Sequence, residues 1–267
     1  MQQRLKVVIV GAGIGGLACA IACRQQNLDV IVLERSTEIL PVGAGIQLPP
    51  NATRVMRHLG LEAALQSAGA VTLEGHNLRS YDSGNPVRRR PLGQAALDLY
   101  GSAWMVIHRA DYQRMLLDAA VQHGAQLCTG CEITKVKSFA DCSVQLKDGR
   151  VFEADVIVGA DGLWSVMRNE VLGRVSTPKE TGDLAYRGTF RAEQLRDCRD
   201  DRVQEVLNAA DLQVWMGPGK HVVFYPVRNK EEFNLVLIQP DDLPEGTRTE
   251  LGSLEEMRRA FEGWDSA

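Results

Sequence analysis

The sequence predicts an α/β fold that combines a parallel sheet with a second, antiparallel sheet. Three observations support this prediction. Residues 5–35 read as strand, glycine-rich turn, helix and strand. Residues 156–168, VIVGADGLWSVMR, form another apolar run followed by a glycine turn and a helix start. Four strand-like segments then lie between residues 184 and 239. The chain has 267 residues, enough to bury a sizeable core as one large domain or two smaller ones.

Composition excludes several classes of protein. The net charge of −4 and the pI near 5.8 make nucleic acid an unlikely main partner. No apolar run approaches the roughly 18 residues of a membrane span. The chain enters a strand almost at once, so we expect no signal peptide and a cytoplasmic, reducing location. Cys128 and Cys131 form a C-x-x-C without a second pair at zinc spacing, and we therefore expect ordinary thiols and no metal.

The first 35 residues carry the strongest motif. Residues 5–10, LKVVIV, are apolar and β-branched, as in a parallel strand buried on both faces. A helix over 14–27 and a strand over 28–35 complete a βαβ unit. The turn between strand and helix contains G-x-G-x-x-G, and an acidic residue ends the second strand 18 residues later; these residues are Gly11, Gly13, Gly16 and Glu34.

In this context the motif predicts a Rossmann-type dinucleotide site. Gly11 allows the tight turn, Gly13 lets the backbone approach a pyrophosphate, and Gly16 lets helix and strand pack closely. The helix N-terminus attracts the phosphates, and Glu34 accepts hydrogen bonds from ribose hydroxyls.

The middle of the chain is less specific. The segment 41-PVGAGIQLPPNATRVMRHLG-60 can bring its backbone close to a flat or charged partner, or it can be an ordinary loop. Asn51 is expected to cap a helix that continues to Leu59. Short strands are expected over 71–107, with the basic run 88–90 on a solvated edge or loop. A further helix is predicted over 109–123. Arg109 at its start opposes the helix dipole unless an anion lies nearby or the charge is solvated.

The segments 184–192, 212–216, 221–227 and 233–239 predict an antiparallel, substrate-facing sheet. Arg187 lies mid-strand, where an inward cation needs an anion. His221 and Tyr225 are four apart on one strand and share a face. They are candidates for a proton acceptor or relay, or are half-buried sheet residues with satisfied hydrogen bonds. We expect a nucleotide-binding domain from 1–75 and 105–180, and a substrate-binding sheet domain from 76–104 and 181–267.

Taken in order, VIVGAGIGG, LER, GAGIQLPPNA, HRADYQRMLL and GADGLWSVMR resemble the single-component FAD-dependent aromatic hydroxylases, with salicylate hydroxylase and its fungal relatives as the nearest group. The resemblance runs over essentially the whole chain. It implies a fold like that of p-hydroxybenzoate hydroxylase, with a Rossmann-type FAD-binding parallel sheet and an antiparallel substrate layer. It also implies contacts to FAD from three further segments, through Ala44 and Gly45, through Arg109, and through Asp161 and Gly162.

Within these contacts, the resemblance implies that Gly11, Gly13, Gly16 and Glu34 hold the ADP part of FAD. Asp161 and Gly162 belong to a motif that contacts both FAD and the nicotinamide donor. Arg168 is either the last residue of that motif or a structural arginine at the surface.

The implied activity is aromatic hydroxylation. NADH or NADPH reduces FAD, O2 adds at the flavin C4a carbon to form a hydroperoxide, and the terminal oxygen is delivered to a phenolic ring. Arg187, Tyr225 and His221 are the implied substrate-side residues.

The sequence departs from the family at its C-terminal end. The family continues with Gly-Asp-Ala-Ala-His followed by Pro and a long helix, whereas this sequence stops at 261-FEGWDSA-267. We therefore expect the C-terminal part to be absent, and the chain to hold FAD weakly and to show no hydroxylation. Three interpretations stay open: a hydroxylase without this part, a catalytically inactive nucleotide-binding homologue, or a different FAD or NAD oxidoreductase that shares only the Rossmann half.

Overall fold

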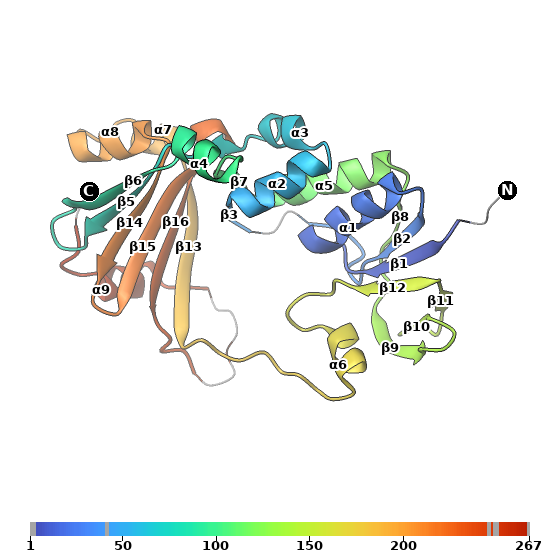
Figure 1. Ribbon diagram of the computed structural model, residues 1–267. Helices are drawn as coiled ribbons and strands as arrows, with labels where there is room; N and C mark the ends of the chain where they lie inside the picture. The colour runs from blue at the N-terminus through green and yellow to red at the C-terminus, as the bar shows by residue number, and fades with distance from the viewer. Residues whose placement is uncertain (1–3, 41–42, 245–246, 248–250, 266–267) are drawn as a thin grey trace. The chain divides into compact units, whose positions relative to one another are not determined.

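The computed structural model describes residues 4–40, 43–244, 247 and 251–265 (Figure 1). The chain divides into two compact units, Met1–Val42 with Ala110–Lys179, and Gly43–Arg109 with Glu180–Ala267. The later boundary lies next to the expected one at 180. The segment 43–75, which we expected in the nucleotide-binding domain, packs in the second unit. Which function each unit serves stays a prediction.

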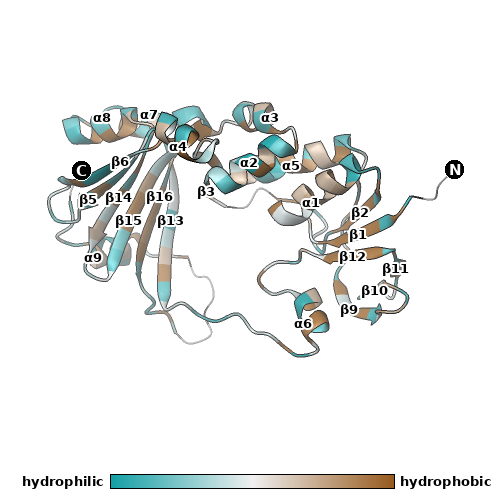
Figure 2. Cartoon of the chain, viewed as in Figure 1, coloured by the Kyte–Doolittle hydropathy of each residue, from teal (hydrophilic) through white to brown (hydrophobic). Residues whose placement is uncertain are grey.

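A four-stranded parallel sheet forms the centre of the first unit. Its order is β12-β1-β2-β8, with β1 at Lys6–Val10, β2 at Asp29–Leu33, β8 at Gln126–Cys128 and β12 at Val156–Gly159. Val8 and Ile9 of β1 are fully buried, and the sheet strands are largely hydrophobic in colour (Figure 2). The predicted strand that is buried on both faces is therefore confirmed.

Helices and a small sheet cover the parallel sheet. The helices are α1 (Ile14–Gln25) and α5 (Arg109–Gln122), of which the second begins where we expected it. An antiparallel sheet of β9 (Ile133–Ser138), β10 (Ser143–Leu146) and β11 (Val151–Glu153) packs on Val8 and Val10 together with α6 (Val166–Leu172). The unit has the α/β layering that the sequence predicts.

The second unit is built on a six-stranded sheet of order β13-β16-β15-β14-β5-β6. The strands are β5 (Gly75–Ser80), β6 (Pro86–Pro91), β13 (Asp183–Arg191), β14 (Asp211–Gly217), β15 (Lys220–Val227) and β16 (Glu232–Pro240). All four strands predicted between 184 and 239 are present, and they pair antiparallel with one another as predicted. The sheet also contains a parallel pair, because β5 joins β14 in that direction. These two strands come from distant parts of the chain, so no hairpin constrains their direction.

A small sheet of β3 (Gly45–Leu48), β7 (Met105–His108) and β4 (Val71–Thr72) belongs to the same unit. Val71 of β4 and Val106 of β7 join a buried cluster with Tyr225 and Val227 of β15. The small sheet therefore shares a core with one face of the six-stranded sheet.

Two local predictions need comment. Helix α2 runs over Pro50–His58 with Pro49 at its N-cap, so the predicted cap at Asn51 is wrong. Proline at the first helical position is favourable because its missing N–H is not needed there. The basic run 88–90 lies in β6, which is exposed at every residue and forms an edge of the sheet, as the sequence predicts.

Several short helices were not predicted: α3 (Glu62–Ser67), α4 (Gly93–Tyr100), α7 (Ala192–Leu195), α8 (Asp201–Asn208), α9 (Leu254–Ala260) and the 3-10 turn η1 (Arg228–Lys230). No helix in the described part of the chain combines the length and apolar character that a membrane crossing requires.

Candidate functional site

The glycine-rich turn after β1 has the geometry that its motif predicts. Gly11 has a φ of +108°, which L side chains rarely adopt, and its N–H donates to the Leu33 carbonyl at 2.7 Å. A Cβ at Gly16 would collide with the Gly11 carbonyl oxygen, so only glycine lets α1 pack this close to the turn. A Cβ at Gly13 would have no described atom within 4 Å, so the backbone there is open to a ligand.

Glu34 binds the turn itself. One carboxylate oxygen accepts the Ala12 N–H and the other accepts the Ser36 N–H, both at 2.9 Å. Gln113 of α5 supports the same turn, since its side-chain amide donates to the Ala12 carbonyl at 3.0 Å. Glu34 was predicted only as a ribose partner. Its bond to Ala12 and the role of Gln113 were missed, because both depend on strands and helices that meet only in the folded unit.

The second glycine turn lies beside the first. β1 and β12 pair in parallel with Val10 opposite Gly159, so the turns that follow them meet at the same edge of the sheet. A Cβ at Gly11 would strike the backbone of Ala160. Open parallel sheets bind ligands at the carboxyl ends of their strands. The two glycine turns, which are far apart in the sequence, therefore lie side by side at the carboxyl-terminal edge of the parallel sheet of the first unit.

Asp161 binds the first turn of α6. Its carboxylate accepts the N–H groups of Val166 at 2.7 Å and Met167 at 3.1 Å, and also the Ser165 hydroxyl. A negative charge at a helix N-terminus is stabilising. Gly162 follows with a φ of +79°. Arg168 is half-buried and donates to the carbonyls of Leu163 and Ser176; whether it also serves the FAD motif stays a prediction.

In the second unit, Ala44 and Gly45 lie beside the start of α5. The Arg109 N–H donates to the Ala44 carbonyl at 2.8 Å, and the Arg109 side-chain stem lies against Gly43. Gly43 has a φ of +120°. The glycine loop and the arginine that were predicted to act together are thus neighbours within this unit.

Arg187, His221 and Tyr225 lie on one face of the six-stranded sheet. Residues directly opposite on paired strands share a face, and Arg187 stands opposite Val236, which stands opposite Val223. Val223 lies midway between His221 and Tyr225 on β15, so both share its face. Arg187 is exposed, His221 is half-buried and Tyr225 is 4% exposed.

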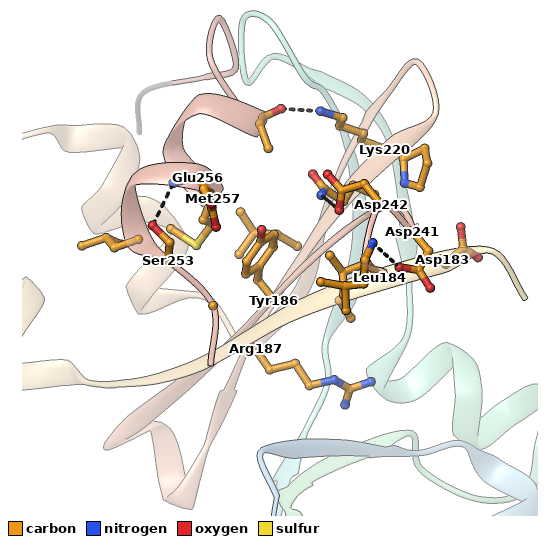
Figure 3. A pocket seen from close by; sticks show the side chains of 18 of the residues that line it. Asp183, Leu184, Tyr186, Arg187, Lys220, Asp241, Asp242, Ser253, Glu256 and Met257 are labelled. Atoms are coloured by element: carbon orange, nitrogen blue, oxygen red, sulfur yellow. Dashed lines mark hydrogen bonds between the residues drawn. The ribbon is translucent and has the colours of Figure 1, made fainter. Parts of the chain in front are cut away.

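Figure 3 shows that the Arg187 side chain points to the opposite side of β13 from Tyr186. A hollow of about 1480 Å³ lies on the Tyr186 side, between the sheet and α9. Arg187 lines the rim of this hollow, whereas His221 and Tyr225 do not line it, so the three predicted residues do not gather there. They face the side of the sheet that shares a core with β4 and β7.

Tyr225 is held against the glycine loop. A Cβ at Gly45 would lie 2.7 Å from the Tyr225 hydroxyl oxygen, so only glycine fits beneath this ring. Burial raises the pKa of Tyr225 to about 12, although the Arg187 guanidinium and the Asn234 side chain act in the opposite direction. Asn234 was not among the residues predicted for the site. Its side-chain oxygen accepts the Gly45 N–H at 2.7 Å.

All six cysteines are free thiols, and burial raises the pKa of Cys131 above its ordinary value. Within the described ranges, no three potential metal ligands lie close enough together to hold an ion.

Comparison with known proteins identifies the family. The family model described as FAD binding domain matches residues 4–262. The chain belongs to this family. The resemblance noted in the sequence is thereby confirmed, and the open glycine turn after β1 fits the nucleotide part of FAD.

The relatives of this chain are longer. It is 35% identical to the FAD-dependent monooxygenase OpS4 of Beauveria bassiana, over 99% of this chain and 62% of the relative. It is also 35% identical to a 3-amino-4-hydroxybenzoate 2-monooxygenase of Streptomyces cremeus, over 97% of this chain and 64% of the relative. The chain thus spans less than two thirds of the length of these relatives.

A solved structure confirms the fold. HpxO of Klebsiella pneumoniae, complexed with FAD and uric acid, superposes with a TM-score of 0.84 at 28% identity, over 100% of this chain and 64% of that one. The predicted fold class, a parallel FAD-binding sheet with an antiparallel layer of the p-hydroxybenzoate hydroxylase type, is confirmed.

Proposed function

We propose that this chain is the cofactor- and substrate-binding part of a monooxygenase that uses FAD, NADH or NADPH, and O2 to hydroxylate a phenolic ring. The observation that carries the proposal is the pair of adjacent glycine turns after β1 and β12 in a chain of the FAD-binding family. When bound, FAD supplies the electron transfer and the activation of oxygen.

The first unit supplies the residues for the nucleotide half of FAD. The open space at Gly13 lets a pyrophosphate reach the N-terminus of α1, whose amide dipoles favour an anion. Each carboxylate oxygen of Glu34 keeps acceptor capacity beyond its one backbone bond, which suits the ribose hydroxyls. Asp161 and Gly162 keep the neighbouring turn in place, because Asp161 ties it to α6.

In the second unit, Ala44, Gly45 and Arg109 are the proposed contacts to the rest of the cofactor, and Arg109 brings a cation to an anionic group. Arg187 is the proposed anchor for an anionic ring substituent. Tyr225 is protonated near neutral pH, as its ordinary pKa of 10.0 already ensures and as the rise to about 12 on burial reinforces, so its hydroxyl donates or relays a proton and does not carry charge. His221, on the same face, is the proposed proton acceptor.

The proposed substrates are hydroxylated aromatic carboxylates. The Streptomyces cremeus relative is named for a hydroxybenzoate, and an exposed guanidinium such as that of Arg187 suits bidentate recognition of a carboxylate.

A titration with FAD, followed by absorbance and flavin fluorescence, tests the cofactor site. Gly13→Val is the informative variant, because Gly13 has an ordinary φ of −75° and space for a side chain. We expect FAD affinity to fall at least about tenfold, or 1.4 kcal/mol, with an unchanged thermal midpoint. Equal FAD binding by the variant would remove the glycine turn from the site.

Turnover is tested separately. The FAD-loaded chain is mixed with NADH or NADPH and a panel of hydroxybenzoates, and products are identified by mass. A hydroxylated product would support the proposed activity, whereas FAD binding without product is the outcome expected of this chain from its sequence and does not separate the proposal from the inactive nucleotide-binding alternative.

A further inference from the structure

Gly45, Tyr225 and Asn234 form a buried junction between the second glycine loop and the six-stranded sheet. Gly45 begins β3, while Tyr225 of β15 stands directly opposite Asn234 of β16. The Gly45 N–H donates to Asn234 Oδ1 at 2.7 Å. Asn234 is 0% exposed. Gly45 and Asn234, which are 189 residues apart in the sequence, thus meet at one side-chain amide.

The bond to Gly45 sets the orientation of this amide. A backbone N–H requires an acceptor, so the Asn234 oxygen faces Gly45 and the Nδ2 group faces elsewhere. Nδ2 is buried and meets the usual distance and angle limits of a hydrogen bond with no described residue, although the Asn234 side chain lies close enough to Tyr225 to oppose the rise in the pKa of its hydroxyl. A buried donor without a partner costs about 1–3 kcal/mol, so packing alone does not account for asparagine here.

The Tyr225 oxygen is the acceptor that the sheet places beside this donor. Tyr225 and Asn234 are cross-strand partners, and the same oxygen lies over Gly45. If Nδ2 donates to this oxygen, the hydroxyl proton of Tyr225 is left to point away from the junction.

We propose that Asn234 is a positioning residue whose Oδ1 holds the Gly45 backbone and whose Nδ2 orients the Tyr225 hydroxyl, so that the glycine loop and the tyrosine keep one fixed geometry. The consequence for ligands rests on the proposed function, in which Gly45 lies along FAD and Tyr225 faces the aromatic ring. Asn234 does not contact either ligand in this proposal.

Two variants separate the two halves of the amide. Asn234→Asp keeps an acceptor for Gly45 and removes the donor, whereas Asn234→Ala removes both. Gln213→Ala is the matched control. Gln213 is another buried side-chain amide of the same sheet, 1% exposed, and its oxygen accepts from Arg79 Nε at 2.9 Å on the opposite face.

The first measurement is hydrogen exchange at the Gly45 amide by NMR, with thermal midpoints recorded alongside. We expect exchange at least about tenfold faster in Asn234→Ala, within about twofold of wild type in Asn234→Asp, and unchanged in Gln213→Ala even where that variant lowers the midpoint. Unchanged Gly45 exchange in Asn234→Ala overturns the proposal, as does equal acceleration in the Gln213 control.

The second measurement reports on the hydroxyl. The Tyr225 ring resonances are assigned with Tyr225→Phe. They should shift in Asn234→Asp while the Gly45 amide keeps its protection. Ring resonances that stay at their wild-type positions overturn the proposed donation from Asn234 Nδ2 to the Tyr225 hydroxyl. FAD affinity should fall about tenfold in Asn234→Ala and recover in Asn234→Asp. If the wild-type chain takes up no FAD, the proposed function fails, and the two NMR readings still decide the role of Asn234.

Discussion

Replacing Glu34 with alanine tests the double role of this carboxylate. It accepts the Ala12 and Ser36 N–H groups, each at 2.9 Å. A hydrogen bond to a charged group contributes roughly 1.5–3 kcal/mol, and the bond to Ser36 is exposed, so water replaces much of its contribution. We expect Glu34→Ala to lower the free energy of unfolding by about 2 kcal/mol.

The affinity for FAD should fall by more than the loss of folding stability alone explains. The alanine variant releases the turn at Ala12 and also removes the proposed ribose acceptor, so we expect the dissociation constant for FAD to rise by at least about tenfold. Glu34→Gln should lie between, because an amide offers one acceptor oxygen and presents an NH2 group to the second N–H.

Urea unfolding and FAD titration measure the two effects. Glu38→Ala is the control, since Glu38 is an exposed carboxylate four residues further along, and its unfolding free energy should stay within about 0.5 kcal/mol of wild type. A Glu34→Ala chain as stable as wild type would refute the role in the turn. Lower stability with unchanged FAD affinity would refute only the ribose contact.

Two further predictions concern the six-stranded sheet. Burial raises the pKa of Tyr225 to about 12 from an ordinary value of 10.0, so the folded chain holds this proton more tightly than the unfolded chain; the resulting stability is complete below about pH 10 and is lost as the pH rises through about 12. Urea unfolding at increasing pH should show a smaller decline in Tyr225→Phe, and equal declines would contradict the burial effect. Arg187→Ala should leave FAD affinity within about twofold and weaken hydroxybenzoate binding about tenfold in a ligand titration, because the exposed guanidinium is proposed to hold the substrate anion. Loss of FAD by this variant would move Arg187 to the cofactor site.

Local patterns in the sequence were sufficient for the first strand–helix–strand unit, for the four strands between residues 184 and 239 and for the first glycine turn. The apolar run before Gly11 predicts a strand buried on both faces, because a parallel strand leaves neither face in water. The glycines at 11, 13 and 16 have the conformations and contacts that the motif demands. The strands carrying Arg187, His221 and Tyr225 were also predicted, and so was the shared face of the last two, because side chains alternate along a strand.

Which segments are neighbours, and how deeply each side chain is buried, were decided only by the tertiary structure. The sequence could not say that the turn at 160–162 lies beside the turn at 11–13, since that depends on β12 pairing with β1. Nor did it show that Asp161 binds the first turn of α6, that Asn234 binds Gly45, or that Tyr225 is almost wholly buried. Periodicity reports which face of one element is apolar, whereas these contacts depend on which distant elements pair and in what register, and that choice is made by the packing of the whole unit.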